Sequence, residues 1–187
     1  GDPIASPTAG YIWDAAARKG LSIRNYGEFV GVAPEAPVSS WDGRFEGKTD
    51  VLRGNTCPFY PGFDTEVLDV ARVDLWLKEF RKQVADGNVP RLTILRLGND
   101  HTEGTRLGAR TPRAMVGDND LALGRLVEAI SASPVWKESA IFVVEDDAVE
   151  HRVRDPIAQP VRPKPQEDDA VHPEVGHDQR VLDVLPG

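Results

Sequence analysis

The chain has 187 residues, a length that suits a single domain, and its 40% apolar content is enough for a hydrophobic core. A formal net charge of -8 argues against a nucleic-acid backbone as the partner. The single cysteine, Cys57, excludes an internal disulfide, and no apolar run approaches the length that a transmembrane segment needs.

The first 64 residues predict a short helix, a strand and a long loop. Residues 11–19 form the helix, which Gly20 ends in a left-handed conformation, and residues 21–30 follow as a strand and its exit. Residues 31–64 combine Gly, Pro, Ser and Asp with scattered aromatics, so we expect a long loop excursion there. Its aromatic side chains are more often anchors to the body of a domain than contacts to a ligand.

Two longer helices are expected next. The first begins at Thr65 with Glu66 in its first turn and ends at Gly87. Its apolar residues recur at steps of three and four and form one stripe: Val70, Val73, Leu77, Phe80 and Val84. The second starts at Thr111-Pro112, a cap followed by proline, and runs to about Ser131. Its expected buried side carries Leu123, Leu126, Val127 and Ile130.

Two apolar runs, 92–97 and 140–144, predict strands of a parallel sheet that the helix between them connects. Polar residues follow both runs: Asn99, Asp100, His101 and Thr102 after the first, Glu145, Asp146 and Asp147 after the second. Because parallel strands end at one sheet edge, we expect these side chains to converge where open α/β sheets bind ligands. Carboxylate and imidazole groups suit a divalent metal. The alternative is ordinary turn formers and a solvated acidic face.

The last forty residues differ in character from the rest. Residues 148–187 are rich in proline, mix both charges and lack an apolar period, so we expect an irregular or disordered tail after a domain at 1–147. The tail repeats the pentapeptide at 145–149, Glu-Asp-Asp-Ala-Val, at positions 167–171. The second copy follows no predicted strand, so we interpret it as coincidence or low complexity.

Several segments together carry a resemblance to a known family. They are Asn99-Asp100-His101-Thr102-Glu103-Gly104-Thr105, Thr111-Pro112-Arg113-Ala114-Met115-Val116, Asp118-Asn119-Asp120 and Val143-Val144-Glu145-Asp146-Asp147-Ala148, with similar pieces at 9–16, 24–28 and 55–64. In this order and spacing they resemble the bacterial phosphoesterase family, which includes phospholipase C and acid phosphatase relatives of the alkaline-phosphatase-like superfamily. The resemblance covers roughly residues 1–148.

The resemblance implies a three-layer α/β sandwich with a mainly parallel sheet and a metal site at its carboxyl edge. Asp146 and Asp147 match the acidic pair that binds metal, and His101 matches a histidine that faces the metal or phosphate. Asn99, Asp100 and Thr102 would be close neighbours of the phosphate. The cofactor would be a divalent ion, with Zn, Mn, Ca and Mg all open.

Two departures from the family pattern bear on activity. The family's nucleophile lies in an N-terminal segment, which we expect to precede Gly1, so no catalytic residue is assigned. After Ala148 the chain departs from the family pattern, and its tail resembles a truncated or frame-shifted end. His151 of this tail is a weak substitute for a metal ligand that the family has and this chain lacks. Relatives are often exported to the periplasm or secreted, but nothing in these residues shows such a location.

The sequence thus favours a metal-dependent hydrolase of phosphoric ester bonds, or an incomplete piece of one. The substrate is a phosphate-ester small molecule or a phospholipid head group. The alternative is a non-catalytic α/β domain that binds a metal or a partner.

Overall fold

The computed structural model describes residues 7–33 and 44–145 of the chain. In chain order the elements are α1 (Ile12–Arg18), β1 (Ile23–Tyr26), β2 (Val30–Val32), β3 (Phe45–Gly47), α2 (Asp50–Arg53), α3 (Asp69–Ala85), β4 (Leu92–Leu95), the 3₁₀ turn η2 (Asn99–His101), α4 (Pro112–Ser131) and the 3₁₀ turn η3 (Trp136–Glu138). The protein is therefore a mixed α/β structure, as expected.

The strands form two small sheets. β1 and β4 are parallel, with Ile23 opposite Leu92 and Tyr26 opposite Leu95. β2 and β3 form a short antiparallel ribbon. The parallel strand predicted at 92–97 is present as β4, and within the described ranges it has β1 as its one partner.

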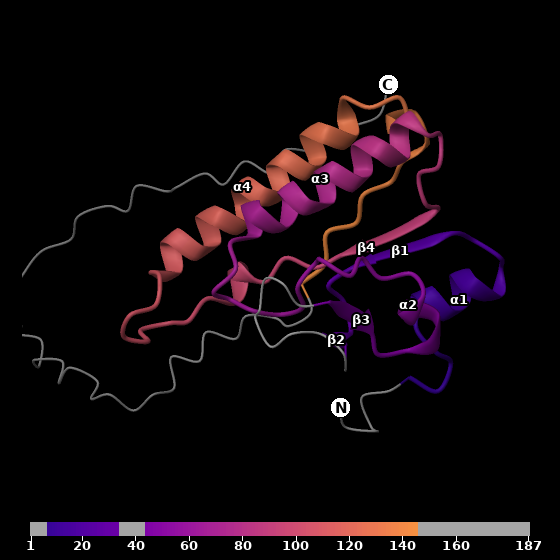
Figure 1. Ribbon diagram of the computed structural model, residues 1–187. Helices are drawn as coiled ribbons and strands as arrows, with labels where there is room; N and C mark the ends of the chain where they lie inside the picture. The colour runs from indigo at the N-terminus through magenta and orange to yellow at the C-terminus, as the bar shows by residue number, and fades with distance from the viewer. Residues whose placement is uncertain (1–6, 34–43, 146–187) are drawn as a thin grey trace, which may run out of the picture. The chain divides into compact units, whose positions relative to one another are not determined.

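Helices cover both faces of the β1–β4 pair. Trp13, Ala16 and Leu52 from α1 and α2 pack with Ile23 on one face. On the other, Tyr26 of β1 packs in a cluster with the apolar stripe of α3. In Figure 1, α3 and α4 run side by side over this second face, and Ala122 and Leu126 of α4 belong to the same cluster. Both cores thus position the carboxyl ends of β1 and β4.

The three principal helices lie where the sequence predicts them. α4 begins at Pro112, and the Thr111 hydroxyl accepts a hydrogen bond from the Ala114 N–H, so the predicted cap is confirmed. The stripe of α3 is buried at Val73, Leu77 and Phe80, as expected. The start of α3 was predicted wrongly: it begins at Asp69, four residues after Thr65, so Glu66 precedes the helix.

The segment between β1 and α3 is more regular than the loop that we predicted for 31–64. It contains β3 and the single turn α2, and residues 34–43 lie outside the described part. Tyr60 is fully buried and anchors the segment, whereas Phe59 and Phe63 are 63% and 50% exposed. Aromatic residues therefore anchor this segment only in part.

The strand predicted at 140–144 is not present. Residues 140–145 have no regular secondary structure, and Phe142, Val143 and Val144 are 86%, 66% and 83% exposed. A strand requires a backbone partner, and the described residues of the chain supply none at this position. An apolar run indicates what a strand would bury but does not specify its pairing.

Candidate functional site

The candidate site is the η2 turn, which follows β4 at the carboxyl edge of the parallel pair. Asn99 at its start is fully buried, whereas Asp100 and His101 are exposed. One residue of the turn therefore attaches it to the core, and the next two face solvent. Ligands of open α/β sheets bind at this edge.

A buried carboxylate fixes the backbone of this turn. Asp69, the first residue of α3, is fully buried and accepts hydrogen bonds from the backbone N–H groups of Gly98 (3.0 Å) and Asn99 (2.8 Å). The side-chain amide of Asn119 in α4 donates to the same carboxylate at 3.0 Å. Backbone N–H groups donating to an ionised carboxylate form charge-assisted bonds, which are stronger than neutral ones.

Arg72 balances the charge of Asp69 inside the protein. Its Nε lies 3.2 Å from Asp69 Oδ1, an ion-pair distance without the geometry of a hydrogen bond. Its other nitrogens donate to the carbonyls of Pro61 (2.7 Å) and Asp64 (2.8 Å). Burial lowers the pKa of the Arg72 guanidinium. Arg72 thereby joins the loop at 61–64 to the same buried group that fixes the turn.

A second carboxylate, Asp118 of α4, connects the turn to the start of α3. It accepts from the Asn99 side-chain amide at 2.6 Å and from the Asp69 backbone N–H at 2.6 Å. The N-cap of α3, Leu68, has no side-chain capping bond of its own. Asp118 therefore caps α3 from a neighbouring helix. We call Asp69, Arg72, Asn99, Asp118 and Asn119 the buried polar network, in which the first three are fully buried and the last two half-buried.

His101 lies on the exposed side of the turn, between an aromatic ring and a carbonyl. Its ring centroid is 5.2 Å from that of Phe63, in an edge-to-face arrangement. Its Nδ1 is 3.1 Å from the backbone oxygen of Thr102. If Nδ1 carries the proton and donates to this oxygen, Nε2 keeps its lone pair. In that tautomer Nε2 is free to bind a metal.

A cation also contacts the Phe63 ring. The guanidinium carbon of Arg96 is 5.1 Å from the Phe63 ring centroid, and the Arg96 Nη1 is 3.6 Å from the Glu28 carboxylate. The Tyr60 hydroxyl donates to the Arg96 carbonyl at 2.8 Å, and burial raises the pKa of that hydroxyl. His101 and Arg96 thus lie on one surface, joined through Phe63.

The backbone is strained at this edge. In the described ranges, the non-glycine residues with positive φ are Phe29 (46°), which follows β1, and Thr102 (57°), which follows η2. Thr102 has a ψ of 178°, a region that glycine alone adopts readily. Strain of this kind clusters at functional sites and persists only where the surroundings impose it.

The structure brings together some of the predicted site residues. Asn99, Asp100, His101 and Thr102 lie on one turn, whereas Asp146 and Asp147 lie outside the described residues. Across 7–33 and 44–145, no three His, Cys, Asp or Glu side chains form a group that could bind a metal. A metal held by His101 therefore requires ligands from the rest of the chain or from the substrate.

Sequence reasoning missed the buried polar network. A signal for it exists in α4, where Met115, Ala122 and Leu126 are buried at helical spacing. Asp118 and Asn119 fall on the same face, three and four residues after Met115, so polar side chains occupy an apolar stripe. A half-buried carboxylate and amide in such a stripe require partners, which indicates a network.

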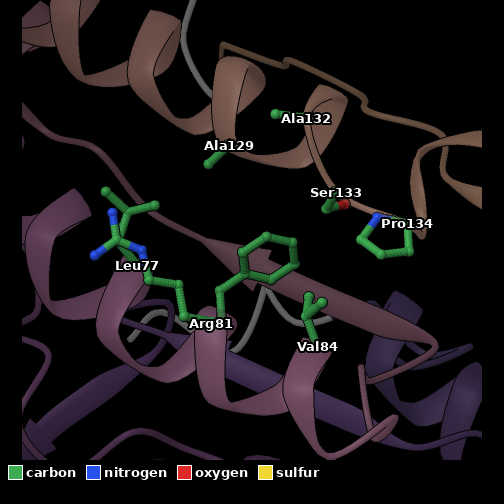
Figure 2. Close-up of a pocket in the computed structure, with 8 residues that line it drawn as sticks. Leu77, Arg81, Val84, Ala129, Ala132, Ser133 and Pro134 are labelled. Atoms are coloured by element: carbon green, nitrogen blue, oxygen red, sulfur yellow. The ribbon is translucent and has the colours of Figure 1, made fainter.

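A groove of about 350 Å³ lies elsewhere, toward the C-terminal ends of α3 and α4 (Figure 2). Its apolar walls include Leu77, Phe80 and Val84 from α3, Ala129 from α4 and Ala132, the C-cap of α4, with Arg81 and Ser133 as polar members. Of the predicted site residues that the structure describes, Asn99, Asp100, His101 and Thr102, none lines this groove. It is a gap between packed helices and separate from the η2 turn.

Comparison with known protein families, curated proteins and solved structures finds no match to this chain. No helix in the described ranges is both long enough and apolar enough to cross a membrane, as expected. Because no known protein matches, the residues of the site are the basis for inferring function.

Proposed function

We propose that the chain carries part of the active site of a metal-dependent hydrolase of phosphoric ester bonds. His101, Asp146 and Asp147 would bind a divalent ion. Asn99, Asp100 and Thr102 would adjoin the phosphate. The observation that supports this proposal most is the position of His101, which is exposed at the carboxyl edge of two parallel strands. Its turn is fixed by the carboxylates of Asp69 and Asp118 and is followed by the strained residue Thr102.

The residues of the site fit such an ion in kind. Imidazole nitrogen and carboxylate oxygen are ligands of zinc and of harder divalent ions. The contact between His101 Nδ1 and the Thr102 carbonyl supports a free Nε2. A bound ion would stabilise the charge on a phosphate ester and activate an oxygen nucleophile. The same proposal includes an alkaline-phosphatase-like three-layer sandwich, which helices on both faces of β1–β4 support.

Calorimetry with Mn²⁺, Zn²⁺ and Ca²⁺, followed by turnover of p-nitrophenyl phosphate, tests the proposal on the full chain. We expect Asp146→Ala to weaken metal binding by at least ~100-fold, because even outer-shell partners of a metal are worth about 10–100-fold. The repeated pentapeptide supplies a matched control: Asp168→Ala alters the same local sequence and should leave binding unchanged. Equal effects of the two substitutions would contradict the assignment of Asp146.

A non-catalytic, metal- or partner-binding domain is the second candidate. The observation that favours its partner-binding form is that the described part of the chain contains no group of three metal-ligating side chains. Metal binding without turnover would support this candidate as a metal-binding domain. Absence of both would remove the metal-dependent proposal.

A further inference from the structure

We propose that Asp118 and Asp69 are positioning residues for His101, acting through the η2 turn. This inference rests on the proposed function for its consequence on binding, but the position of His101 is measurable without it. Three features support this inference. Side chains of α3 and α4 hold the turn, every polar group of the Asn99 side chain has a hydrogen-bond partner, and the strained conformation of Thr102 requires that support.

The η2 turn has no long regular element of its own to orient it. Its orientation comes from the buried polar network, since Asp69 accepts both Gly98 N–H and Asn99 N–H, and Asp118 accepts the Asn99 amide. Each of these two carboxylates also bonds to the other helix. Asp118 of α4 accepts the backbone N–H of Asp69 in α3, and Asp69 accepts the side-chain amide of Asn119 in α4. The turn is therefore coupled to the packing of α3 against α4.

Asn99 has a partner for each polar group of its side chain. Its Nδ2 donates to Asp118 at 2.6 Å and to the Val67 carbonyl at 3.1 Å. Its Oδ1 accepts from Arg110 at 3.3 Å. An asparagine with all these bonds has one orientation, and it fixes the two residues that follow it.

The strain at Thr102 is consistent with this constraint. Its conformation costs on the order of 1–3 kcal/mol and persists only where neighbouring structure over-determines it. The bond between Thr102 N–H and the Asn99 carbonyl (3.2 Å) transmits the position of Asn99 to Thr102. His101 lies between these two residues, so its direction is set on both sides.

The test uses Asp118→Asn in the full chain, with Asp74→Asn as the matched control. Asp74 also joins α3 to α4, through an ion pair with Arg125, but contacts no residue of the η2 turn. Asp118 Oδ2 accepts both the Asn99 amide and the Asp69 N–H. Asp118→Asn replaces the carboxylate with a neutral amide, so both charge-assisted bonds weaken if the amide oxygen takes the place of Oδ2, and both are lost if the NH₂ group takes it. The helix interface therefore keeps its shape while the turn loses part of its support.

The readout is the proton resonance of the His101 imidazole, assigned by its loss in His101→Gln. The Phe63 ring, 5.2 Å away, shifts this resonance, so a displaced histidine gives a changed signal. We expect Asp118→Asn to move the resonance and to weaken Mn²⁺ and inorganic phosphate binding by about 10-fold or more, as outer-shell partners do. Asp74→Asn should change neither.

The outcomes are distinguishable. An unmoved resonance in folded Asp118→Asn overturns the positioning role. If Asp118→Asn does not fold, Asn119→Ala, which removes one neutral donor to Asp69, carries the same test. If the unsubstituted chain binds neither Mn²⁺ nor phosphate, the proposed function fails, while the resonance still decides whether these carboxylates position His101.

Discussion

Thr102 has a backbone conformation that disagrees with its side chain. Its φ of 57° and ψ of 178° suit glycine, and threonine is β-branched besides. Thr102→Gly removes strain on the order of 1–3 kcal/mol and adds about 0.5–1 kcal/mol of backbone entropy cost. We expect a net gain of about 1 kcal/mol in the free energy of unfolding, measured by urea denaturation.

Thr93→Gly is the matched control for this substitution. Thr93 is exposed in β4, where an extended backbone suits threonine, so glycine there should destabilise by about 0.5–1 kcal/mol. A loss of stability in Thr102→Gly similar to that in Thr93→Gly would show that the strain is not real.

Single residues were predictable from the sequence where their role is local. The Thr111-Pro112 start of α4 depends on a bond to Ala114 three residues away, and the sequence displays both partners. Asp69 was not predictable in the same way, because its partners Asn99 and Asn119 lie 30 and 50 positions away. Without those contacts, an aspartate at the start of a helix indicates only a favourable interaction with the helix dipole.

Helix α4 offers two neighbouring positions with opposite constraints. Ala122 is fully buried against α3, whereas an added Cβ at Gly124 meets no atom within 4 Å. We expect Gly124→Ala to stabilise by about 0.5–1 kcal/mol, since glycine is a poor helix former. Ala122→Leu should destabilise by about 1–3 kcal/mol, because added methylenes overpack the interface.

Thermal and urea unfolding of both variants measure this contrast. Gly117→Ala, another open position in α4, should behave as Gly124→Ala does. Tolerance of leucine at position 122 would contradict the close packing of α3 on α4.

Helices and strands, like single residues, were predictable where the residues that specify them lie within the same segment. The stripe of α3 repeats within the helix, so Val73, Leu77 and Phe80 identified the buried face correctly. The strand predicted at 140–144, which the structure lacks, would need a partner distant in the chain, and its own apolar residues do not specify one. The short elements β3 and α2 were missed because three or four residues carry too little periodicity.

For the whole molecule, we expect the free energy of unfolding to fall at alkaline pH, because several core side chains must remain uncharged. Burial raises the pKa of Tyr26, Tyr60 and Cys57. A group with a raised folded-state pKa contributes stability that is complete below its unfolded pKa and is lost as pH rises toward the folded value. We therefore expect stability to fall above about pH 8.5 for the thiol and about pH 10 for the tyrosines.

Urea denaturation between pH 7 and 11 measures this decline. Tyr60→Phe should cost about 1 kcal/mol at pH 7, because the bond to the Arg96 carbonyl is lost. Above pH 10 its decline should be shallower than that of the unsubstituted chain by about 1.4 kcal/mol per pH unit. Tyr26→Phe should show the same reduction. Parallel declines in Tyr60→Phe and the unsubstituted chain would refute the linkage.

The candidate site was predictable from the sequence only in its exposed half. The residues after β4 were located correctly at a carboxyl edge, because an apolar run and its polar exit are adjacent in the chain. Their convergence with Asp146 and Asp147 stays a prediction, since those two residues lie outside the described ranges. The buried support of the turn depends on contacts between α3, β4 and α4, which no single segment reveals.

The buried polar network also has a consequence for the order in which this protein assembles. Asp69, Asn99 and Asp118 are separated by 30 and 19 positions, so their mutual bonds close long loops, and we expect them to form late, after both helices have docked. A chain with only part of its core in place has helices but no oriented η2 turn. Any ligand that binds the oriented turn selects the completed fold, and its binding free energy becomes stability of the whole domain.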